Sequence, residues 1–242
     1  NDSIAAYDKA ITLAEQQNPR DKVIAQYRSN RSLARSMLGD FSPLENEQRR
    51  YVFQDAITDA VKATELDASY ESAWGALGQA KERLGNLLSG VPARTNYAEA
   101  EKAYRQQLAS RPSLAQGHAY LGRCLVRWAM DDGNNSTRLD TGRDELNKAI
   151  KLDNDLAEAH FWLGRYYLLK NDAGRANEEF LKAIHHPDLG KNFLNQTLAL
   201  LYNQPAVLQP LLNQVIPANL NQCKVEHVTS LIVRSTLARR PI

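Results

Sequence analysis

The sequence has few residues at the spacings that catalysis requires. It contains no phosphate-binding glycine loop, no H-E-x-x-H zinc motif and no G-x-S-x-G nucleophile elbow. Its five histidines have no carboxylate or cysteine at metal-ligand spacing, and Cys124 and Cys223 form no C-x-x-C pair. His185 and His186 end a predicted helix, where positive charge is favourable, so we interpret them as a helix terminus. We therefore predict no catalytic residue, no metal, no cofactor and no enzymatic activity.

The arginines of the sequence offer a different chemistry, which is the binding of anions. Arg123 and Arg165 each follow a Leu-Gly pair, and Gln79 follows a third such pair. A guanidinium group presents a planar fork of donors that fits a carboxylate or a phosphate, so this row favours an acidic ligand. The alternative is a solvated face whose arginines pair with Glu82 or Glu158. With their neighbours one helical turn away, the candidate partner-binding residues are Gln79, His118, Arg123, Arg127, Phe161 and Arg165.

The elements that would position these residues are repeated along the chain. Leu-Gly pairs begin at Leu77, Leu121 and Leu163, which are 44 and 42 residues apart. Lys-Ala-Ile occurs at 9–11, 148–150 and 182–184, the last two copies being 34 residues apart. Only 9 Pro and 12 Gly occur among 242 residues, so the pattern favours repeated helix-turn-helix units. The expected helices cover 3–17, 21–38, 49–66, 70–86, 97–110, 114–131, 138–152, 156–170, 173–185, 190–203, 205–215 and 219–238.

These segments resemble the units of the tetratricopeptide repeat (TPR) family, in which Trp, Leu-Gly and Tyr of a first helix precede Ala, an aromatic residue, Ala and Pro of a second. The unit at 157–187 fits without insertion, and its matching residues are Leu163, Gly164, Tyr167, Ala176, Phe180 and Ala183. Units at 27–67, 72–112 and 115–153 carry insertions near 42–53, 87–95 and 130–137, and residues 3–17 match only a second helix.

The resemblance implies an all-α fold and a function. We expect a right-handed α-superhelical solenoid of TPR-like repeats over residues 1–188 and a non-repeat helical C-terminal cap over 189–242. In such an array the first helices line a concave groove, and the candidate row would project into it. The implied function is a protein–protein interaction scaffold or adaptor that binds a peptide or protein segment in this groove. The insertions should lie at one edge, since each separates the two helices of its unit.

Two other functions remain open. The first is a regulatory or sensor TPR region of a larger multidomain protein, such as a kinase, a protease or a nucleotide switch, with which the incomplete first unit is consistent. The second is an RNA-binding helical repeat, which would need basic residues in every unit, and Leu33 interrupts the row.

Charge and hydropathy narrow the class of partner. Thirty basic and 28 acidic residues give a net charge of only +2, which provides no field that would draw the chain to nucleic acid. No stretch approaches the roughly 18 to 20 apolar residues that span a bilayer. We expect a protein or peptide partner, with an acidic segment as one form, no nucleic acid, no membrane span and a location for which the cytoplasm is favoured. The sequence does not indicate an oligomeric state.

Overall fold

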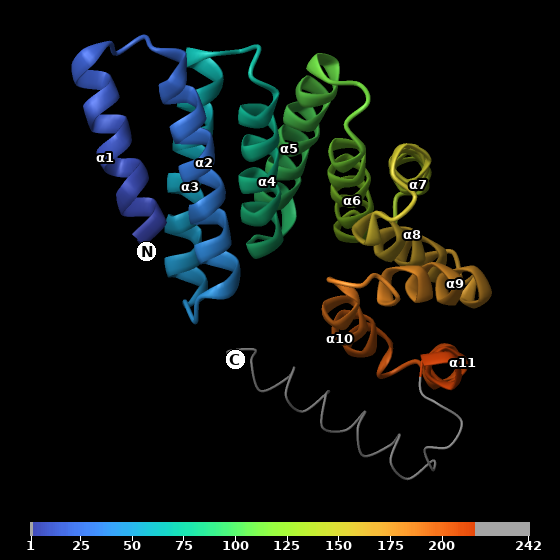
Figure 1. The fold of residues 1–242 in the computed structure, drawn as a ribbon. Coiled ribbons are helices and arrows are strands. Elements are labelled where there is room, and N and C mark those ends of the chain that lie inside the picture. Colours follow the sequence, from blue (N-terminus) through green and yellow to red (C-terminus); the bar gives the residue numbers. More distant parts are fainter. Residues whose placement is uncertain (1, 216–242) are drawn as a thin grey trace. The chain divides into compact units, whose positions relative to one another are not determined.

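All regular structure in the described part of the chain is helical. The computed structural model describes residues 2–215, and within this range it contains helices and no strand (Figure 1). The helices are α1 (Asp2–Gln17), α2 (Lys22–Phe41), α3 (Asn46–Leu66), α4 (Glu71–Leu87), α5 (Gly90–Ser110), α6 (Ala115–Asp131), α7 (Ser136–Leu152), α8 (Ala157–Leu169), α9 (Ala173–Ile184), α10 (Gly190–Leu201) and α11 (Pro205–Val215). The expected all-α fold is confirmed. The helix predicted at 219–238 lies outside the described residues.

Local signals explain where several helices begin. The side chain of Asp21 accepts a hydrogen bond from the backbone N–H of Val23 at 3.0 Å, and Asp172 accepts one from Arg175 at 3.1 Å. These carboxylates satisfy N–H groups that have no partner inside the first turn of a helix. Helices α2 and α9 therefore start where the sequence provides an acidic cap.

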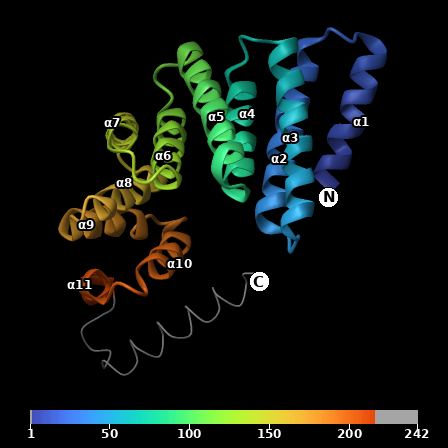
Figure 2. The same ribbon diagram turned by 180° about the vertical axis from the view of Figure 1, so that it is seen from behind.

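The chain forms two compact units, with the boundary between Glu145 and Leu146 inside α7. In the first unit, α2 packs antiparallel against α3, and α4 packs in the same way against α5 (Figure 1). The first helices α2 and α4 also contact each other, as do α4 and α6. The view from behind brings the second helices α3 and α5 forward (Figure 2). First and second helices thus form separate layers of this unit.

The second unit repeats the helix pair and then departs from it. Helices α8 and α9 form the pair, and both α10 and α11 pack against α9. Its core is aromatic, because Phe161, Phe180 and Phe193 are buried together with Trp162. The predicted division into a repeat array over 1–188 and a cap over 189–242 is based on where the repeat pattern ends, whereas the two units are distinguished by how compactly they pack. The predicted division stays a prediction.

Glycines allow the paired helices to approach closely. A Cβ atom added to Gly78 would lie 2.6 Å from the ring of Tyr104, and one added to Gly164 would lie 2.7 Å from the ring of Phe180. Both distances are too short for a real Cβ atom, so only glycine lets the aromatic ring of the second helix cover the first. The Leu-Gly pairs that begin at Leu77 and Leu163 therefore mark equivalent positions in different repeats.

Much of the inserted length is helical, and two helices begin earlier than predicted. Helix α5 begins at Gly90 rather than near 97, because Pro92 lies in the first turn, where a missing N–H removes no hydrogen bond. Helix α3 likewise begins at Asn46 rather than near 49. The extra residues lengthen the pairs, since α2 and α3 have 20 and 21 residues whereas α8 and α9 have 13 and 12. The connections α2–α3 and α4–α5 lie at the edge opposite α1–α2 and α3–α4 (Figure 1).

Candidate functional site

The residues three positions before Leu77, Leu121 and Leu163 have the same structural role in their repeats. The Nε1 atom of Trp74 donates to the carbonyl oxygen of Ala68 at 2.9 Å. The Nε2 atoms of His118 and His160 contact the carbonyl oxygens of Pro112 and Asn154, both at 2.9 Å. In each case the ring nitrogen holds the carbonyl group six residues earlier in the chain, in the turn that precedes the first helix. The candidate residue His118 therefore anchors a turn between repeats.

Both histidines also bind a carboxylate of the second helix. The Nδ1 atom of His118 lies 2.6 Å from Oε2 of Glu145, and Nδ1 of His160 lies 2.6 Å from Oε2 of Glu179. Each ring therefore faces an oxygen acceptor at both of its nitrogens. Burial raises the pKa of Glu179, but hydrogen bonds from His160 and Lys182 outweigh it and hold that pKa below its ordinary value.

The candidate residue Arg123 binds a buried carboxylate inside the chain. Its Nε and Nη2 atoms lie 2.8 and 2.6 Å from the two oxygens of Glu82, which also accepts from the hydroxyl of Tyr104 at 2.8 Å. Arg127 approaches the same carboxylate at 3.8 Å. Burial raises the pKa of Glu82, but the two arginines and Tyr104 lower it further than burial raises it. The expected fork chemistry is thus present, and its observed anion is Glu82 of the neighbouring first helix.

The remaining candidates lie in different surroundings. Arg165 stacks on Trp162, with Cζ 4.4 Å from the ring centroid, just as Arg123 stacks on Tyr120 at 4.7 Å. Phe161 is only 3% exposed, which places it in the core of the second unit. Gln79 accepts a hydrogen bond from Nη1 of Arg83 at 3.2 Å. The structure brings Gln79, Arg123 and Arg127 to contacting first helices α4 and α6, and it places Phe161 and Arg165 on α8 of the second unit.

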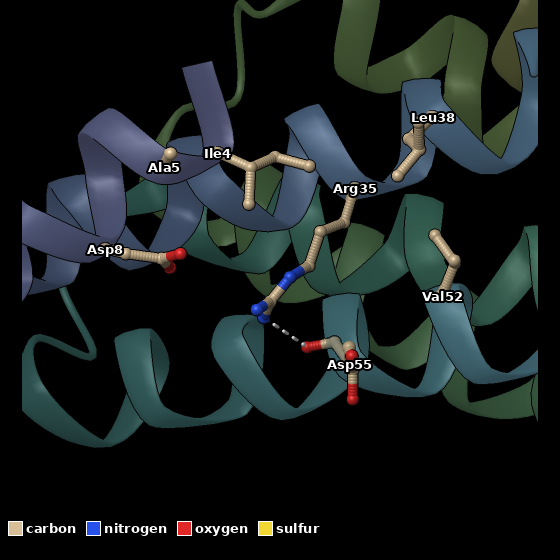
Figure 3. A pocket seen from close by; sticks show the side chains of 7 residues that line it. All are labelled: Ile4, Ala5, Asp8, Arg35, Leu38, Val52 and Asp55. Carbon is tan, nitrogen blue, oxygen red and sulfur yellow. Dashed lines mark hydrogen bonds between the residues drawn. The ribbon is translucent and has the colours of Figure 1, made fainter. Parts of the chain in front are cut away.

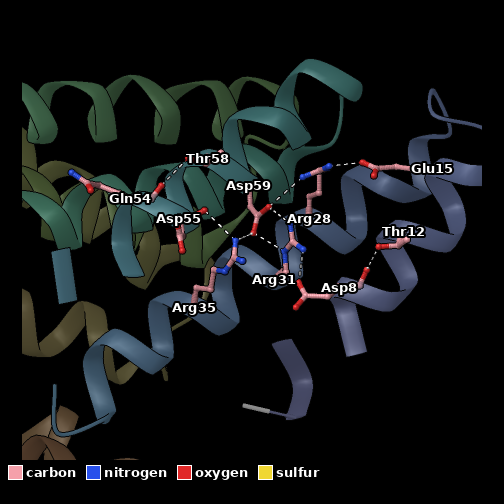
Figure 4. Close-up of polar contacts among 10 residues, drawn as sticks. All are labelled: Asp8, Thr12, Glu15, Arg28, Arg31, Arg35, Gln54, Asp55, Thr58 and Asp59. Carbon is pink, nitrogen blue, oxygen red and sulfur yellow. Dashed lines mark hydrogen bonds and ion pairs between the residues drawn. The ribbon is translucent and has the colours of Figure 1, made fainter. Parts of the chain in front are cut away.

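A second arginine cluster has no counterpart in the sequence-based expectation. Arg28, Arg31 and Arg35 of α2 converge on the carboxylate of Asp59 in α3, which is 1% exposed (Figure 4). Nη1 of Arg28 lies 3.3 Å and Nε of Arg31 2.8 Å from this carboxylate. The spacing of three, then four residues places the arginines on one helix face. The spacing of the arginines can be read from the sequence. Their pairing with Asp59 cannot, because Asp59 lies on another helix and no sequence pattern indicates that it faces them.

Two classes of site are not found in the described part of the chain. Residues 2–215 hold no group of three or more His, Cys, Asp or Glu side chains arranged to bind a metal ion. None of their helices combines the length and apolar character needed to cross a bilayer. Burial raises the pKa of the Cys124 thiol well above its ordinary value, which disfavours the reactive thiolate.

Comparison with known proteins identifies the fold. No protein family model matches the sequence, and no curated protein matches it either. The crystal structure of TTC0263, a thermophilic TPR protein in Thermus thermophilus, is similar with a TM-score of 0.57 and 18% identity, over 81% of this chain and 91% of that one. The crystal structure of MamA is similar with a TM-score of 0.50 and 18% identity, over 76% and 85% of the two chains. The chain therefore has the fold of the tetratricopeptide repeat proteins.

Proposed function

We propose that this protein is a non-enzymatic interaction scaffold that holds a peptide or protein segment on its first helices. The observation that carries the proposal is the direct contact of α2 with α4 and of α4 with α6. Because these helices lie side by side, their outward side chains line one face of the first unit. A surface built by several repeats offers a partner many separate contacts, which is how helical arrays bind extended ligands.

The arginines of this surface differ in how freely they can meet a partner. The side chain of Arg123 is 13% exposed and forms a bidentate contact with Glu82, so we assign it to holding the helices together. The side chain of Arg127 is 35% exposed and lies farther from the same carboxylate. We propose that Arg127 and Gln79 contact acidic groups of the partner on the first unit. Arg165 is a separate candidate for such a contact on the second unit. We propose that Phe161 and His118 support the helices from below the surface and do not contact the partner.

Two matched double variants test this proposal. A peptide selected against the wild-type chain from a random display library would be titrated against Arg127→Gln with Arg165→Gln. We expect at least tenfold weaker binding, because charged hydrogen bonds contribute about 1.5 to 3 kcal/mol each. The control is Arg105→Gln with Arg175→Gln, which removes two exposed arginines from the second helices α5 and α9. Equal binding by both double variants would refute the assignment of these arginines.

A further inference from the structure

Helix α1 lies on the arginine row of α2 and supplies it with carboxylates. Nη1 of Arg31 lies 2.5 Å from Oδ1 of Asp8, and Nη2 of Arg28 contacts Oε1 of Glu15 (Figure 4). Since the lower-numbered acid meets the higher-numbered arginine, the two helices run antiparallel. Three arginines against Asp59 alone leave an excess of two positive charges, and the two carboxylates of α1 cancel that excess. The arginine row is therefore an acid-binding surface that α1 occupies.

Helix α1 buries few side chains for a helix of its length. It has 16 residues, of which Ile11 alone is buried. The side chains of Asp8 and Glu15 are 51% and 42% exposed, so solvent screens both ion pairs. Ion pairs with a solvent-screened partner stabilise a helix only weakly, and Ile11 is the single fully buried side chain that α1 contributes. A second helix with better contacts could therefore compete with α1 for the same surface.

The surroundings of Arg35 indicate which residue a helix that binds more tightly than α1 would carry. Ile4 lies one helical turn before Asp8 on the face toward α2, and Figure 3 shows its side chain directed toward Arg35 and Leu38. A cavity of about 300 Å³ lies here, lined by Ile4, Ala5, Asp8, Arg35, Leu38, Val52 and Asp55. Arg35 binds Asp59 and lies 3.4 Å from the backbone carbonyl of Asp55. An acidic residue at the position of Ile4 would bring a further carboxylate to Arg35.

We propose that Arg28, Arg31 and Arg35 form a docking site for an acidic amphipathic helix of a partner protein, which binds by replacing α1. The ligand helix would carry carboxylates at the positions of Ile4, Asp8 and Glu15, which follow the spacing i, i+4 and i+11, with an apolar residue at the position of Ile11. The site lies on the side of α2 that faces α1. It does not include Gln79, Arg127 or Arg165, so it stands or falls independently of the function proposed above.

A synthetic peptide serves as the probe for this site. It has the sequence of residues 2–17 with Ile4→Glu and carries a fluorescent label, so that its binding to the full chain can be followed by anisotropy. The full chain would be compared with a variant in which Asp8→Lys and Glu15→Lys make α1 repel its own arginines. The matched control is Asp2→Lys with Gln16→Lys and Gln17→Lys, which adds the same charge to α1 at exposed positions.

The expected result is a clear difference between the two variants. A tethered helix competes at an effective concentration in the millimolar range, so its release should tighten peptide binding at least tenfold. The control should bind as the wild type does. A scrambled peptide of the same composition, with its acids spread around the helix, should bind at least tenfold more weakly to the released chain. Equal binding of both peptides would reduce the site to general charge attraction and overturn the proposal.

Hydrogen exchange provides the second measurement. In the released variant the amides of 2–17 should exchange faster than in the wild type, while those of α3, α4 and α5 keep their protection. The milder variant Asp8→Asn with Glu15→Gln should show the same pattern to a smaller extent. If both variants lose protection throughout residues 22–110, α1 is an integral part of the fold and the proposal is wrong. Unchanged protection of α1 in both variants would overturn it as well.

Discussion

In the described part of the chain, the buried carboxylates of Asp59, Glu82 and Glu179 are each bound by basic side chains. Asp59 binds three arginines, Glu82 binds Arg123 and Arg127, and Glu179 binds His160 and Lys182. An ionised carboxylate in a protein interior is costly unless it is paired and hydrogen-bonded. These clusters therefore fix which helix faces meet, since a slipped helix would leave a buried charge without its partner.

Removing one member of the Glu82 cluster should be much more harmful than removing two. We expect Arg123→Met to lower the free energy of unfolding by about 3 to 5 kcal/mol, because Glu82 is 2% exposed and would lose its bidentate partner. Adding Glu82→Leu to this variant should restore a large part of the loss. Urea denaturation measures both, with Arg105→Met as an exposed control. A double variant less stable than the single one would contradict this account.

The loss of folding stability at acidic pH should depend in part on Glu179. Its pKa is depressed in the folded chain, so the stability it contributes is present above its ordinary value of 4.5 and is lost as the pH falls through the lower folded value. Glu179→Gln removes this dependence, and the loss of stability between pH 7 and pH 3 should be smaller than in the wild type. Urea denaturation at these two pH values tests it, with the exposed neighbour Glu178→Gln as control. An identical loss in both variants would show that Glu179 does not contribute.

At the scale of the helix pair, close approach sets the geometry. Gly164→Ala would place a methyl group 2.7 Å from the ring of Phe180 and 3.1 Å from the carbonyl oxygen of Ala176. We expect destabilisation of about 1 to 3 kcal/mol, because neither a packed ring nor a backbone can move away cheaply. Gly174→Ala, in the first turn of α9, meets nothing nearer than 3.8 Å and should be neutral or stabilise by a few tenths of a kcal/mol. Thermal unfolding distinguishes the two, and equal effects would argue against close packing at Gly164.

The helices could be predicted from the sequence because their signals are local. Low proline content and acidic caps such as Asp172 act within one helix or one turn, and the Leu-Gly pairs can be recognised because they recur along the sequence. The start of α5 was misplaced because Pro92 and Gly90 look like loop residues, although both are tolerated at a helix start. The Asp59 cluster was missed for the opposite reason. It depends on which helices become neighbours, and one sequence without its fold does not contain that information.

At the scale of the whole molecule, division into two compact units predicts separable stability. A repeat contacts mainly its neighbours, so a local defect should weaken its own unit first. In the variant Gly164→Ala, we expect amide hydrogens of 157–201 to lose protection while those of 22–110 keep theirs. Hydrogen exchange with mass spectrometry measures both ranges in one sample. The reciprocal variant Gly78→Ala, which crowds Tyr104 in the first unit, should reverse the pattern. Equal loss of protection in both ranges would mean that the chain unfolds as one cooperative body despite its two units.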